Sequence, residues 1–472
     1  MQLGVRTFEE RDQRTFAVLS GDSNPMHMDH VAARRTQMGA PVVHGMHAVL
    51  WALELACQQV SEAFSGLRVN FAGPIYVGDP VEAALISHAA TQAKIHLRVG
   101  NALATSITLE LGPMICETPA MRTGPPRPAT WPPNPLPLAF GEMAGQADAF
   151  HFARGPQDAT AGYPALADRI TPNRVGALVA LSRLVGMICP GLHSIFSGVT
   201  LDFAPEDRPA LQYECVEADP RFRRIRIAVA GGGIAGELTA FARLPPTEQP
   251  SFADIAAVTA AGAYQGATVL VVGGSRGLGE VTAKACAAGG AEVVITYAKG
   301  ASEAEHVAEQ IRAGGGRCRV VQFDAREAVA AQLAAVTEPI THLYYYATGP
   351  IAVRRTKFLS ADVLADFMRF YTTAFVDTCE ALVAHGDGAR LRAFYPSSTA
   401  IYERPKGWAE YAMAKAAGEV LCREINMQRR DIEVIVERLP RLLTDQTAAV
   451  RPAGEEPALA VILPIVVRMQ AP

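Results

Sequence analysis

The sequence lacks the features of a nucleic-acid-binding, membrane-spanning or secreted protein. Lys and Arg nearly balance Asp and Glu, and the formal charge of −4 gives no strong field to attract nucleic acid or an anionic membrane. No apolar run is long enough to span a bilayer, and the polar start lacks the layout of a secretory signal. The eight cysteines include no Cys-x-x-Cys pair, which is typical of reduced thiols. We therefore expect a cytoplasmic protein with a small, nearly neutral ligand.

Proline-rich stretches divide the 472 residues into three segments. Residues 123–137 contain proline so densely that neither a helix nor a central strand can form there, and a second such stretch runs from Leu244 to Pro250. A typical domain length of about 150 residues also predicts about three domains. We place the domains at residues 1–122, 138–245 and 262–472.

The first two segments repeat one pattern. Phe64-Ser-Gly-Leu-Arg-Val-Asn-Phe-Ala72 recurs as Phe196-Ser-Gly-Val-Thr-Leu-Asp-Phe-Ala204. An apolar stretch with helical spacing precedes each copy, Met46 to Cys57 in the first and Ala177 to Ile188 in the second. Stretches rich in Val, Ile, Leu and Thr follow each copy and indicate antiparallel strands, among them residues 81–87, 95–99 and 224–229. This pattern predicts a long apolar helix wrapped by a sheet, made twice.

The third segment alternates strands and helices. An apolar run at residues 268–272 precedes Gly273-Gly-Ser-Arg-Gly-Leu-Gly279, which is followed by helical sequence and a second apolar run at residues 292–296. Strand, glycine turn, helix and strand in this order are typical of a parallel, doubly wound sheet. Gly273, Gly277 and Gly279 are spaced so that the chain turns tightly and a pyrophosphate can approach the backbone at the start of the helix.

Three residues further along can act on a carbonyl group. Tyr411 and Lys415 are four positions apart and therefore share one face of a helix. A free tyrosine has a pKa of about 10, and a nearby ammonium favours its phenolate, so this pair can exchange protons at neutral pH. Ser398, thirteen residues before Tyr411, is placed to hold a carbonyl oxygen for protonation. An exposed pair on a surface helix is the alternative interpretation of Tyr411 and Lys415.

From about Gly266 onward the chain resembles the short-chain dehydrogenase/reductase family, and its glycine turn is similar to that of the 3-oxoacyl thioester reductases. The resemblance implies that Ser398, Tyr411 and Lys415 are catalytic. Arg276, together with Thr296 and Tyr297 where an acidic residue would bind an NAD ribose, favours NADP(H) as the cofactor. The resemblance places the following residues at the dinucleotide: Gly273, Ser275, Arg276, Gly277, Gly279, Asp324 and Ala325.

The third segment departs from the pattern of that family in three places. Tyr345-Tyr-Ala-Thr-Gly349 stands where the family has Asn-Asn-Ala-Gly, and Tyr371 stands where an Asn of the proton relay is expected. Pro440-Arg441 replaces the usual Pro-Gly. Because the three catalytic residues are all present, we expect an active reductase with a modified site.

A dense polar motif, Gly21-Asp-Ser-Asn-Pro-Met-His27 followed by Val43-His-Gly-Met46, opens the first segment. From about Phe16 to Pro113 the chain resembles the MaoC-type (R)-specific enoyl-thioester hydratases and dehydratases, which adopt the hot-dog fold. Removing water from a 3-hydroxyacyl thioester needs a base and an acid, which Asp22 and His27 can supply. The N–H of Gly45, opening the apolar helix, can stabilise the enolate-like oxygen. We expect Asn24 to organise the turn rather than react.

Two further observations concern this motif. His27 with His30, and His44 with His47, have spacings that suit a metal, but no thiolate or carboxylate set completes a site, so we expect none. The aligned stretch of the second copy, residues 152–163, contains no histidine and retains only Asp158. We therefore expect one catalytic half and one degenerate half.

The predicted fold class is an α+β double hot-dog unit followed by an α/β doubly wound (Rossmann) parallel-sheet domain. The predicted function is NADPH-dependent reduction of a 3-oxoacyl thioester and dehydration of the product to the 2-enoyl thioester, as in fatty acid or polyketide-type biosynthesis. The alternatives are a hydratase with a 3-hydroxyacyl dehydrogenase in degradation, or one silent module that serves as a scaffold. The carrier is coenzyme A or acyl carrier protein, and we expect a homo-oligomer.

Overall fold

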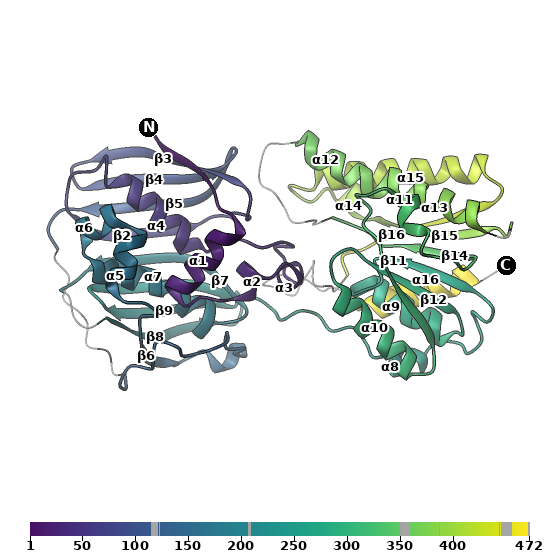
Figure 1. Ribbon diagram of the computed structural model, residues 1–472, viewed down its shortest axis with the longest axis horizontal. Coiled ribbons are helices and arrows are strands. Elements are labelled where there is room, and N and C mark those ends of the chain that lie inside the picture. Colours follow the sequence, from purple (N-terminus) through teal and green to yellow (C-terminus); the bar gives the residue numbers. More distant parts are fainter. Residues whose placement is uncertain are drawn as a thin grey trace. The chain divides into compact units, whose positions relative to one another are not determined.

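Alternating and continuous apolar runs form the strands of two separate sheets, one in each of two units (Figure 1). The computed structural model describes residues 1–114, 121, 123–205, 209–349, 351, 359–386, 388–442, 444 and 456–470. Unit 1 comprises residues 1–245, and unit 2 comprises the described residues from 246 onward. Each unit is considered by itself below.

Unit 1 contains a ten-stranded sheet built from two matching halves. Its strand order is β1-β3-β4-β5-β2-β7-β10-β9-β8-β6, so the two halves mirror each other across the β2–β7 pair. In this antiparallel pair Arg68 lies opposite Thr200, which are equivalent positions of the two repeat copies. The strands are β1 (Gln2–Thr7), β2 (Phe64–Phe71), β3 (Pro80–Ala89), β4 (Gln92–Val99), β5 (Ala102–Leu111), β6 (Ala147–His151), β7 (Ser194–Phe203), β8 (Ala210–Asp219), β9 (Arg224–Gly231) and β10 (Ile234–Ala242).

One long apolar helix accompanies each half of this sheet, as the repeat predicts. The first is α4 (Gly45–Ala56), and the second is α7 (Pro172–Arg183), which continues into the π-helix η2 (Leu184–Ile188). Both helices pack with the strands into one hydrophobic core. The other helices of unit 1 are α1 (Glu10–Ser20), α2 (Pro25–Met28), α3 (His30–Arg34), η1 (Phe140–Glu142), α5 (Pro156–Gly162) and α6 (Pro164–Ile170).

Unit 2 contains a six-stranded sheet whose strands are all parallel. Their order, β13-β12-β11-β14-β15-β16, is that of a doubly wound sheet, which confirms this part of the predicted fold. Val269 and Val271 enter the core on one face of the sheet, whereas Leu270 and Val272 enter the core on the other. The strands are β11 (Thr268–Val272), β12 (Glu292–Tyr297), β13 (Arg317–Gln322), β14 (His342–Tyr345), β15 (Leu391–Ser398) and β16 (Ile432–Leu439).

Helices cover both faces of this parallel sheet (Figure 1). Within the described ranges, no helix is both long enough and apolar enough to cross a lipid bilayer. The helices of unit 2 are α8 (Phe252–Ala256), α9 (Gly277–Ala288), α10 (Ala301–Ala313), α11 (Val329–Leu333), α12 (Ala361–Met368), η3 (Arg369–Thr373), α13 (Ala374–His385), α14 (Ala400–Glu403), α15 (Ala409–Gln428) and α16 (Ala458–Gln470).

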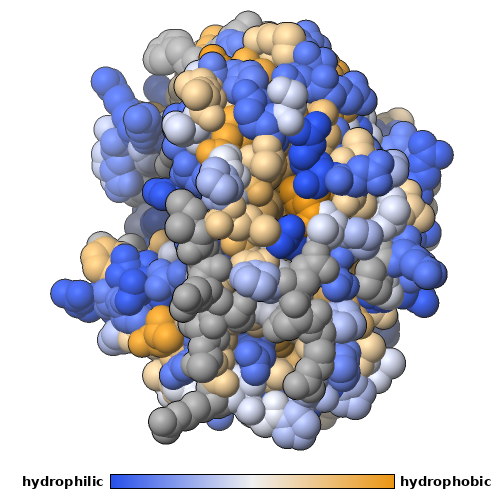
Figure 2. Space-filling view, turned by 90° about the vertical axis from the view of Figure 1, so that its left-hand side faces the viewer, coloured by the Kyte–Doolittle hydropathy of each residue, from blue (hydrophilic) through white to orange (hydrophobic). Residues whose placement is uncertain are grey.

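The surface of unit 1 is mixed in polarity, and the described cysteines form no disulfides. Figure 2 shows hydrophobic residues in a band near the middle of one face, with hydrophilic residues on both sides.

Seven of the eight cysteines are free thiols, and the eighth, Cys116, lies outside the described residues.

Glu54 of α4 connects the two halves of unit 1, and this contact can be tested. Its carboxylate accepts hydrogen bonds from the N–H groups of Ala165, at 3.0 Å, and Leu166, at 2.8 Å, at the start of α6. In Glu54→Ala these N–H groups lose their acceptor, so we expect unit 1 to lose about 1 kcal/mol of unfolding free energy. Calorimetry should show a lower Tm for its transition, with Glu54→Gln in between. An unchanged Tm in Glu54→Ala would contradict this role.

Candidate functional site

The predicted motif of unit 1 forms a buried turn between α1 and α2. Gly21 ends α1 with a φ of 73°, and the side chains of Ala153 and Arg183 lie where a Cβ would project. A left-handed backbone conformation at a position with no room for a Cβ favours glycine. Asp22 and Asn24 follow, and each is 1% exposed. The turn thus carries two polar side chains into the interior of unit 1.

Asn24 fastens this turn to the second half of the unit. Its Oδ1 accepts from the N–H of Met26 at 3.1 Å and thereby caps α2. Its Nδ2 donates to the carbonyl oxygen of Gly186, in η2, at 2.7 Å. All polar atoms of the Asn24 side chain therefore serve to hold the turn, as the sequence predicts for an organising residue.

The Asp22 carboxylate is held by groups from both halves. Ser182 of α7 donates its hydroxyl to Oδ2 at 2.7 Å, and the N–H of Asn24 donates to Oδ1 at 3.1 Å. Burial raises the pKa of Asp22, while His27 and these two hydrogen bonds lower it in part. A Cβ on Gly186 would overlap both carboxylate oxygens, so the backbone of η2 also packs directly on Asp22.

His27 faces Asp22 with one ring nitrogen available. Its Nδ1 lies 2.7 Å from the carbonyl oxygen of Val42, and because a carbonyl can only accept, Nδ1 carries the proton. In the neutral ring Nε2 is then a proton acceptor. One ligand atom each from Asp22, His27 and His44 lie within 4.8 Å of one another. Asp22 and His27 can therefore act together on one small polar group.

His44 supports the ring of His27 and joins Asp22 and His27 in a group whose ligand atoms could hold a metal ion, a set that the histidine spacings in the sequence did not bring together. The two rings stack with centroids 3.9 Å apart. The nitrogens of His44 lie 2.9 Å from Gln13 Oε1 and 3.1 Å from the carbonyl oxygen of Asp22. Burial lowers the pKa of His44 well below its usual range, which favours the neutral ring. A neutral ring carries a single N–H, so it donates to only one of these two oxygens.

The other two histidines of the motif lie outside the Asp22 and His27 pair. His30 is exposed and its Nε2 lies 2.7 Å from Glu10 Oε1. His47 is buried, with its ring stacked on Phe16 at 4.7 Å, and burial lowers its pKa to about 3. The pairs His27 with His30 and His44 with His47, considered from their spacing, therefore form no joint ligand sets.

The two long helices begin at different places relative to the repeat. Helix α4 begins at Gly45, whose N–H is one of the first-turn groups without an intrahelical acceptor. Phe71 Cε1 lies 2.8 Å from the place of a Cβ on Gly45, so a side chain would collide there. The repeat that matches Phe64 with Phe196 aligns Gly45 with Ala177, but α7 begins earlier, at Pro172, and encloses the N–H of Ala177 within the helix. The second half therefore presents no first-turn N–H at the position equivalent to Gly45.

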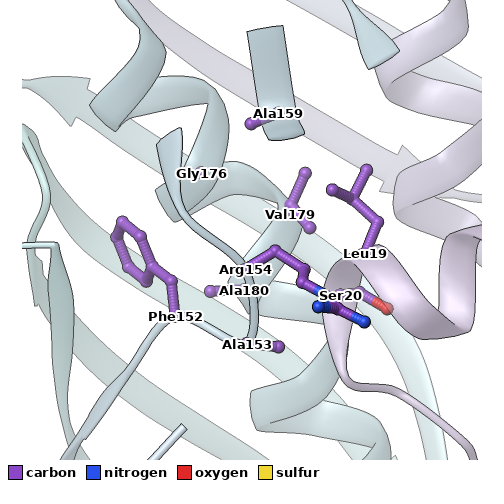
Figure 3. Close-up of a pocket in the computed structure, with 9 residues that line it drawn as sticks. All are labelled: Leu19, Ser20, Phe152, Ala153, Arg154, Ala159, Gly176, Val179 and Ala180. Carbon is purple, nitrogen blue, oxygen red and sulfur yellow. The ribbon is translucent and has the colours of Figure 1, made fainter. Parts of the chain in front are cut away.

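The stretch aligned with the motif in the second half lies at the surface and beside a small pocket. Asp158 is exposed in the first turn of α5 and faces no catalytic partner. Figure 3 shows a pocket in which Leu19 and Ser20 of α1 face Val179 and Ala180 of α7. The pocket is lined by Leu19, Ser20, Phe152, Ala153, Arg154, Ala159, Gly176, Val179 and Ala180.

In unit 2 the glycine turn joins β11 to the start of α9. Gly273 and Gly277 have φ values of 81° and 57°, in the left-handed region that glycine adopts readily. A Cβ on Gly279 would overlap the carbonyl of Gly273, so the helix packs tightly on the turn. Thr296 of β12 holds the turn by accepting from the N–H of Gly273 at its Oγ1, 3.1 Å away. The first-turn N–H groups of α9 are thus presented beside this turn.

The remaining residues of the predicted dinucleotide site lie near the carboxyl ends of neighbouring strands. Ser275 is buried, and Arg276 is the residue that precedes α9. Asp324 and Ala325 follow β13, where the N–H of Asp324 donates to Gln332 Oε1 at 2.7 Å. Ligands of doubly wound sheets bind outside the carboxyl ends of the strands, and these residues are grouped there.

Ser398, Tyr411 and Lys415 come together at the end of β15. Ser398 is the last residue of this strand, and Tyr411 and Lys415 lie one turn apart on α15. Burial raises the pKa of Tyr411, and a side-chain hydrogen bond with Ser398 lowers it in part. Lys415 Nζ donates to the carbonyl oxygen of Pro396 at 2.6 Å, and burial lowers the pKa of this lysine to about 7. Both side chains are buried, which contradicts the alternative of an exposed surface pair.

The three departures from the family pattern fall around this group. Tyr345 donates its hydroxyl to the carbonyl oxygen of Phe370 at 3.0 Å, and the Thr348 and Tyr371 hydroxyls are hydrogen-bonded to each other. Tyr371 lies in η3 and is buried. Pro440 and Arg441 follow β16. Hydrogen-bonded tyrosine rings thus stand at positions where the family usually has the smaller side chain of asparagine.

Two known families match the regions of the chain that contain these two groups of residues. The family described as "MaoC like domain" matches residues 4–106, and the family described as "short chain dehydrogenase" matches residues 267–455. The chain joins a MaoC-like domain to a short-chain dehydrogenase domain. This confirms the predicted fold class, in which a hot-dog unit precedes a Rossmann domain.

Individual relatives match parts of the chain. An (R)-specific enoyl-CoA hydratase of Aeromonas caviae is 35% identical over 81 residues, which are 16% of this chain and 60% of that protein. An uncharacterized oxidoreductase of Methylorubrum extorquens is 43% identical over 68 residues, which are 14% of this chain and 27% of that protein. The aligned regions therefore cover less than two thirds of either relative.

Solved short-chain dehydrogenases align with part of the chain. One from Burkholderia cenocepacia, in complex with NADP, is 27% identical, covers 44% of this chain and 92% of its own, and has a TM-score of 0.39. One from Serratia marcescens is 24% identical with the same coverage and the same TM-score.

Sequence reasoning missed Ser182 and Gly186, which the second half brings to the MaoC-like domain. Ser182 is the hydroxyl donor to Asp22, and Gly186 provides both the closest backbone and the acceptor for Asn24. A serine and a glycine at fully buried positions of these two helical segments were the available signal. Their partner could not be read from sequence because it lies 160 residues away.

Removing the Ser182 hydroxyl should change the titration of Asp22. Its hydrogen bond stabilises the ionised carboxylate, so Ser182→Ala should raise the pKa of Asp22 further, by about one pH unit. Carboxyl carbon NMR of aspartate-labelled protein measures this midpoint. Ser194→Ala, which removes another buried hydroxyl of the second half, is the matched control. Equal midpoints in Ser182→Ala and the parent protein would show that this bond does not act on Asp22.

Proposed function

We propose that the chain is a bifunctional acyl-thioester enzyme, which reduces a 3-oxoacyl thioester with NADPH and then dehydrates the 3-hydroxyacyl product to the 2-enoyl thioester. The observation that carries this proposal is the presence, in one chain, of two complete groups of residues whose reactions are consecutive. Asp22, His27 and the Gly45 N–H suit the dehydration. Ser398, Tyr411 and Lys415 beside a glycine turn suit the reduction.

The dehydration uses Asp22 as the acid and His27 as the base. Burial favours the protonated Asp22 carboxyl, which can give its proton to the departing 3-hydroxyl group. His27 Nε2, left as an acceptor by the bond between Nδ1 and Val42, takes the proton from C2. The N–H of Gly45, at the positive end of α4, stabilises the negative charge that develops on the thioester oxygen. Hydration uses the same groups in reverse.

The reduction uses Tyr411 as the proton donor to the 3-oxo group. Ser398 holds the carbonyl oxygen, and its hydrogen bond with Tyr411 places the phenol beside that oxygen. Lys415, one helical turn further, provides the positive charge that favours loss of the proton from Tyr411. When bound, the nicotinamide cofactor supplies the hydride that C3 receives. C3 thus receives a hydride and its oxygen receives a proton from Tyr411, so atoms and charge balance in the alcohol product.

The cofactor site fits NADP(H). The tight packing of Gly279 on Gly273 leaves no room for a side chain, and the start of α9 supplies N–H groups for a pyrophosphate. Thr296 and Tyr297 stand at the end of β12, where an acidic residue would repel a 2′-phosphate. Arg276, beside the turn, supplies a guanidinium of the kind that binds phosphate.

The substrate carrier we favour is coenzyme A. The support is the name of the Aeromonas caviae relative, an enoyl-CoA hydratase, which aligns with the MaoC-like domain. Fusion of the two domains raises the local concentration of the 3-hydroxyacyl product for the second step. The second hot-dog half serves the first by supplying Ser182 and Gly186.

Two variants separate the two steps. Asp22→Asn should reduce dehydration of a 3-hydroxyacyl thioester by about 100- to 10,000-fold, because the acid is lost, and leave reduction intact. Tyr411→Phe should reduce NADPH-dependent reduction of a 3-oxoacyl thioester by a similar factor and leave dehydration intact. Absorbance of NADPH follows the first reaction and absorbance of the conjugated enoyl product the second.

Each variant is the control for the other, because both keep the fold of the untouched domain. Unchanged dehydration in Asp22→Asn would contradict the assignment of Asp22 and His27 as the dehydration site. Reduction that survives Tyr411→Phe would do the same for the second, and a parent protein without reduction would leave the short-chain dehydrogenase domain as a scaffold.

A further inference from the structure

Tyr371 occupies the position of the expected relay asparagine, and its ring faces the charge of Lys415. Lys415 Nζ lies 3.8 Å from the centroid of the Tyr371 ring, well within the range of a cation–π contact. The rings of Tyr395 and Tyr411 are further away, at 5.1 and 5.9 Å. The Tyr371 ring is therefore the aromatic surface closest to this ammonium group.

No acidic group neutralises Lys415 among the residues that the structure describes. Its nearest carboxylate on α15, Glu419, is engaged by Arg438, with an N–O distance of 2.7 Å, and by Ser397 at 2.6 Å. From the elements packed around it, the titratable groups that face Lys415 are Tyr371 of η3, Tyr395 of β15, and Tyr411 and Cys422 of α15. Burial keeps the Tyr371 and Tyr395 phenols neutral, because it raises their pKa values.

The Tyr371 ring is fixed in this position from several sides. Its hydroxyl is hydrogen-bonded to that of Thr348, and its ring stacks on Phe367 with centroids 5.8 Å apart and planes 9° apart. Its own carbonyl oxygen accepts from the Tyr395 hydroxyl at 3.0 Å. The ring also meets Tyr411 edge to face at 5.7 Å. A ring held so firmly can exclude water from Lys415.

We propose that the Tyr371 ring keeps Lys415 in its charged form beside Tyr411, in place of the hydrogen-bonding relay side chain usual at this position. This makes Tyr371 a positioning residue of the reductase, acting through Lys415. The face of an aromatic ring attracts an ammonium but gains little from a neutral amine, so it selects the charged form in a buried place. The proposal rests on the proposed reductase function for its role in activity, whereas the effect on Lys415 itself does not.

The test is the titration of Lys415 in the full chain without substrate. NMR of the side-chain carbon next to Nζ, in lysine-labelled protein with Lys415→Arg to assign the signal, reports its midpoint. Tyr371→Leu should lower this midpoint by about one pH unit, because the ring is removed. Tyr371→Phe keeps the ring and should leave the midpoint where it is. Tyr345→Leu removes a neighbouring buried ring that does not face Lys415 and is the matched control.

Activity provides the second readout. In Tyr371→Leu the alkaline limb of the pH profile for reduction should move to lower pH by the same amount, with kcat reduced and KM for NADPH unchanged. If the parent protein reduces no 3-oxoacyl thioester, the proposed function fails, whereas the titration still decides the role of Tyr371.

Two results would overturn the proposal: the same midpoint in Tyr371→Leu as in the parent protein, or an equal shift in Tyr371→Phe. Should Tyr371→Leu fail to fold, fluorinated phenylalanines placed at position 371 keep the ring's size and weaken its attraction for cations. The midpoint should then fall stepwise with each added fluorine, and a constant midpoint would contradict the proposal.

Discussion

The pairing of β2 with β7 is the constraint on which the first unit depends. It joins two half-sheets that each accompany an apolar helix, and places equivalent residues such as Arg68 and Thr200 opposite each other. Because the halves share one core, α7 and η2 of the second half are held against the turn that follows α1. A carboxylate can remain buried there only if groups around it compensate for its lost hydration. Ser182 provides such a group, so the second half contributes directly to the environment of Asp22.

The second unit meets a related difficulty with a buried cation. Lys415 is buried without a carboxylate partner among the described residues, and it receives one carbonyl oxygen, from Pro396, and one aromatic face, from Tyr371. Burial alone would favour the neutral amine. In both units the buried charged or titratable group lies against a short helical element: Gly186 of η2 packs on Asp22, and Tyr371 of η3 faces Lys415. Both elements are π-helices, which shift the backbone of a helix locally and are frequent at functional sites.

Much of the fold and of both candidate sites could be predicted from sequence, since their signals are local. The repeat of Phe64 to Ala72 indicated the two halves, and the glycine turn after residues 268–272 indicated the doubly wound sheet. Asp22 and His27 were visible because they share one short motif. Ser182 and Gly186 were not visible in this way, because their contacts with Asp22 join the two halves across the β2–β7 pair. The replacement at Tyr371 was visible, but not the direction of its ring, which depends on η3 and on Thr348.

The central claim is that one chain carries out two consecutive steps on one thioester. The most direct measurement is the mass of the product formed from a short 3-oxoacyl-CoA and NADPH deuterated at the transferred C4 position. We expect a 2-enoyl thioester that retains one deuterium at C3, together with the 3-hydroxyacyl thioester in equilibrium with it. Deuterium reaches C3 with the hydride, and dehydration removes a proton from C2 only. Unchanged substrate, or a 3-hydroxyacyl thioester with no enoyl product, would contradict the claim.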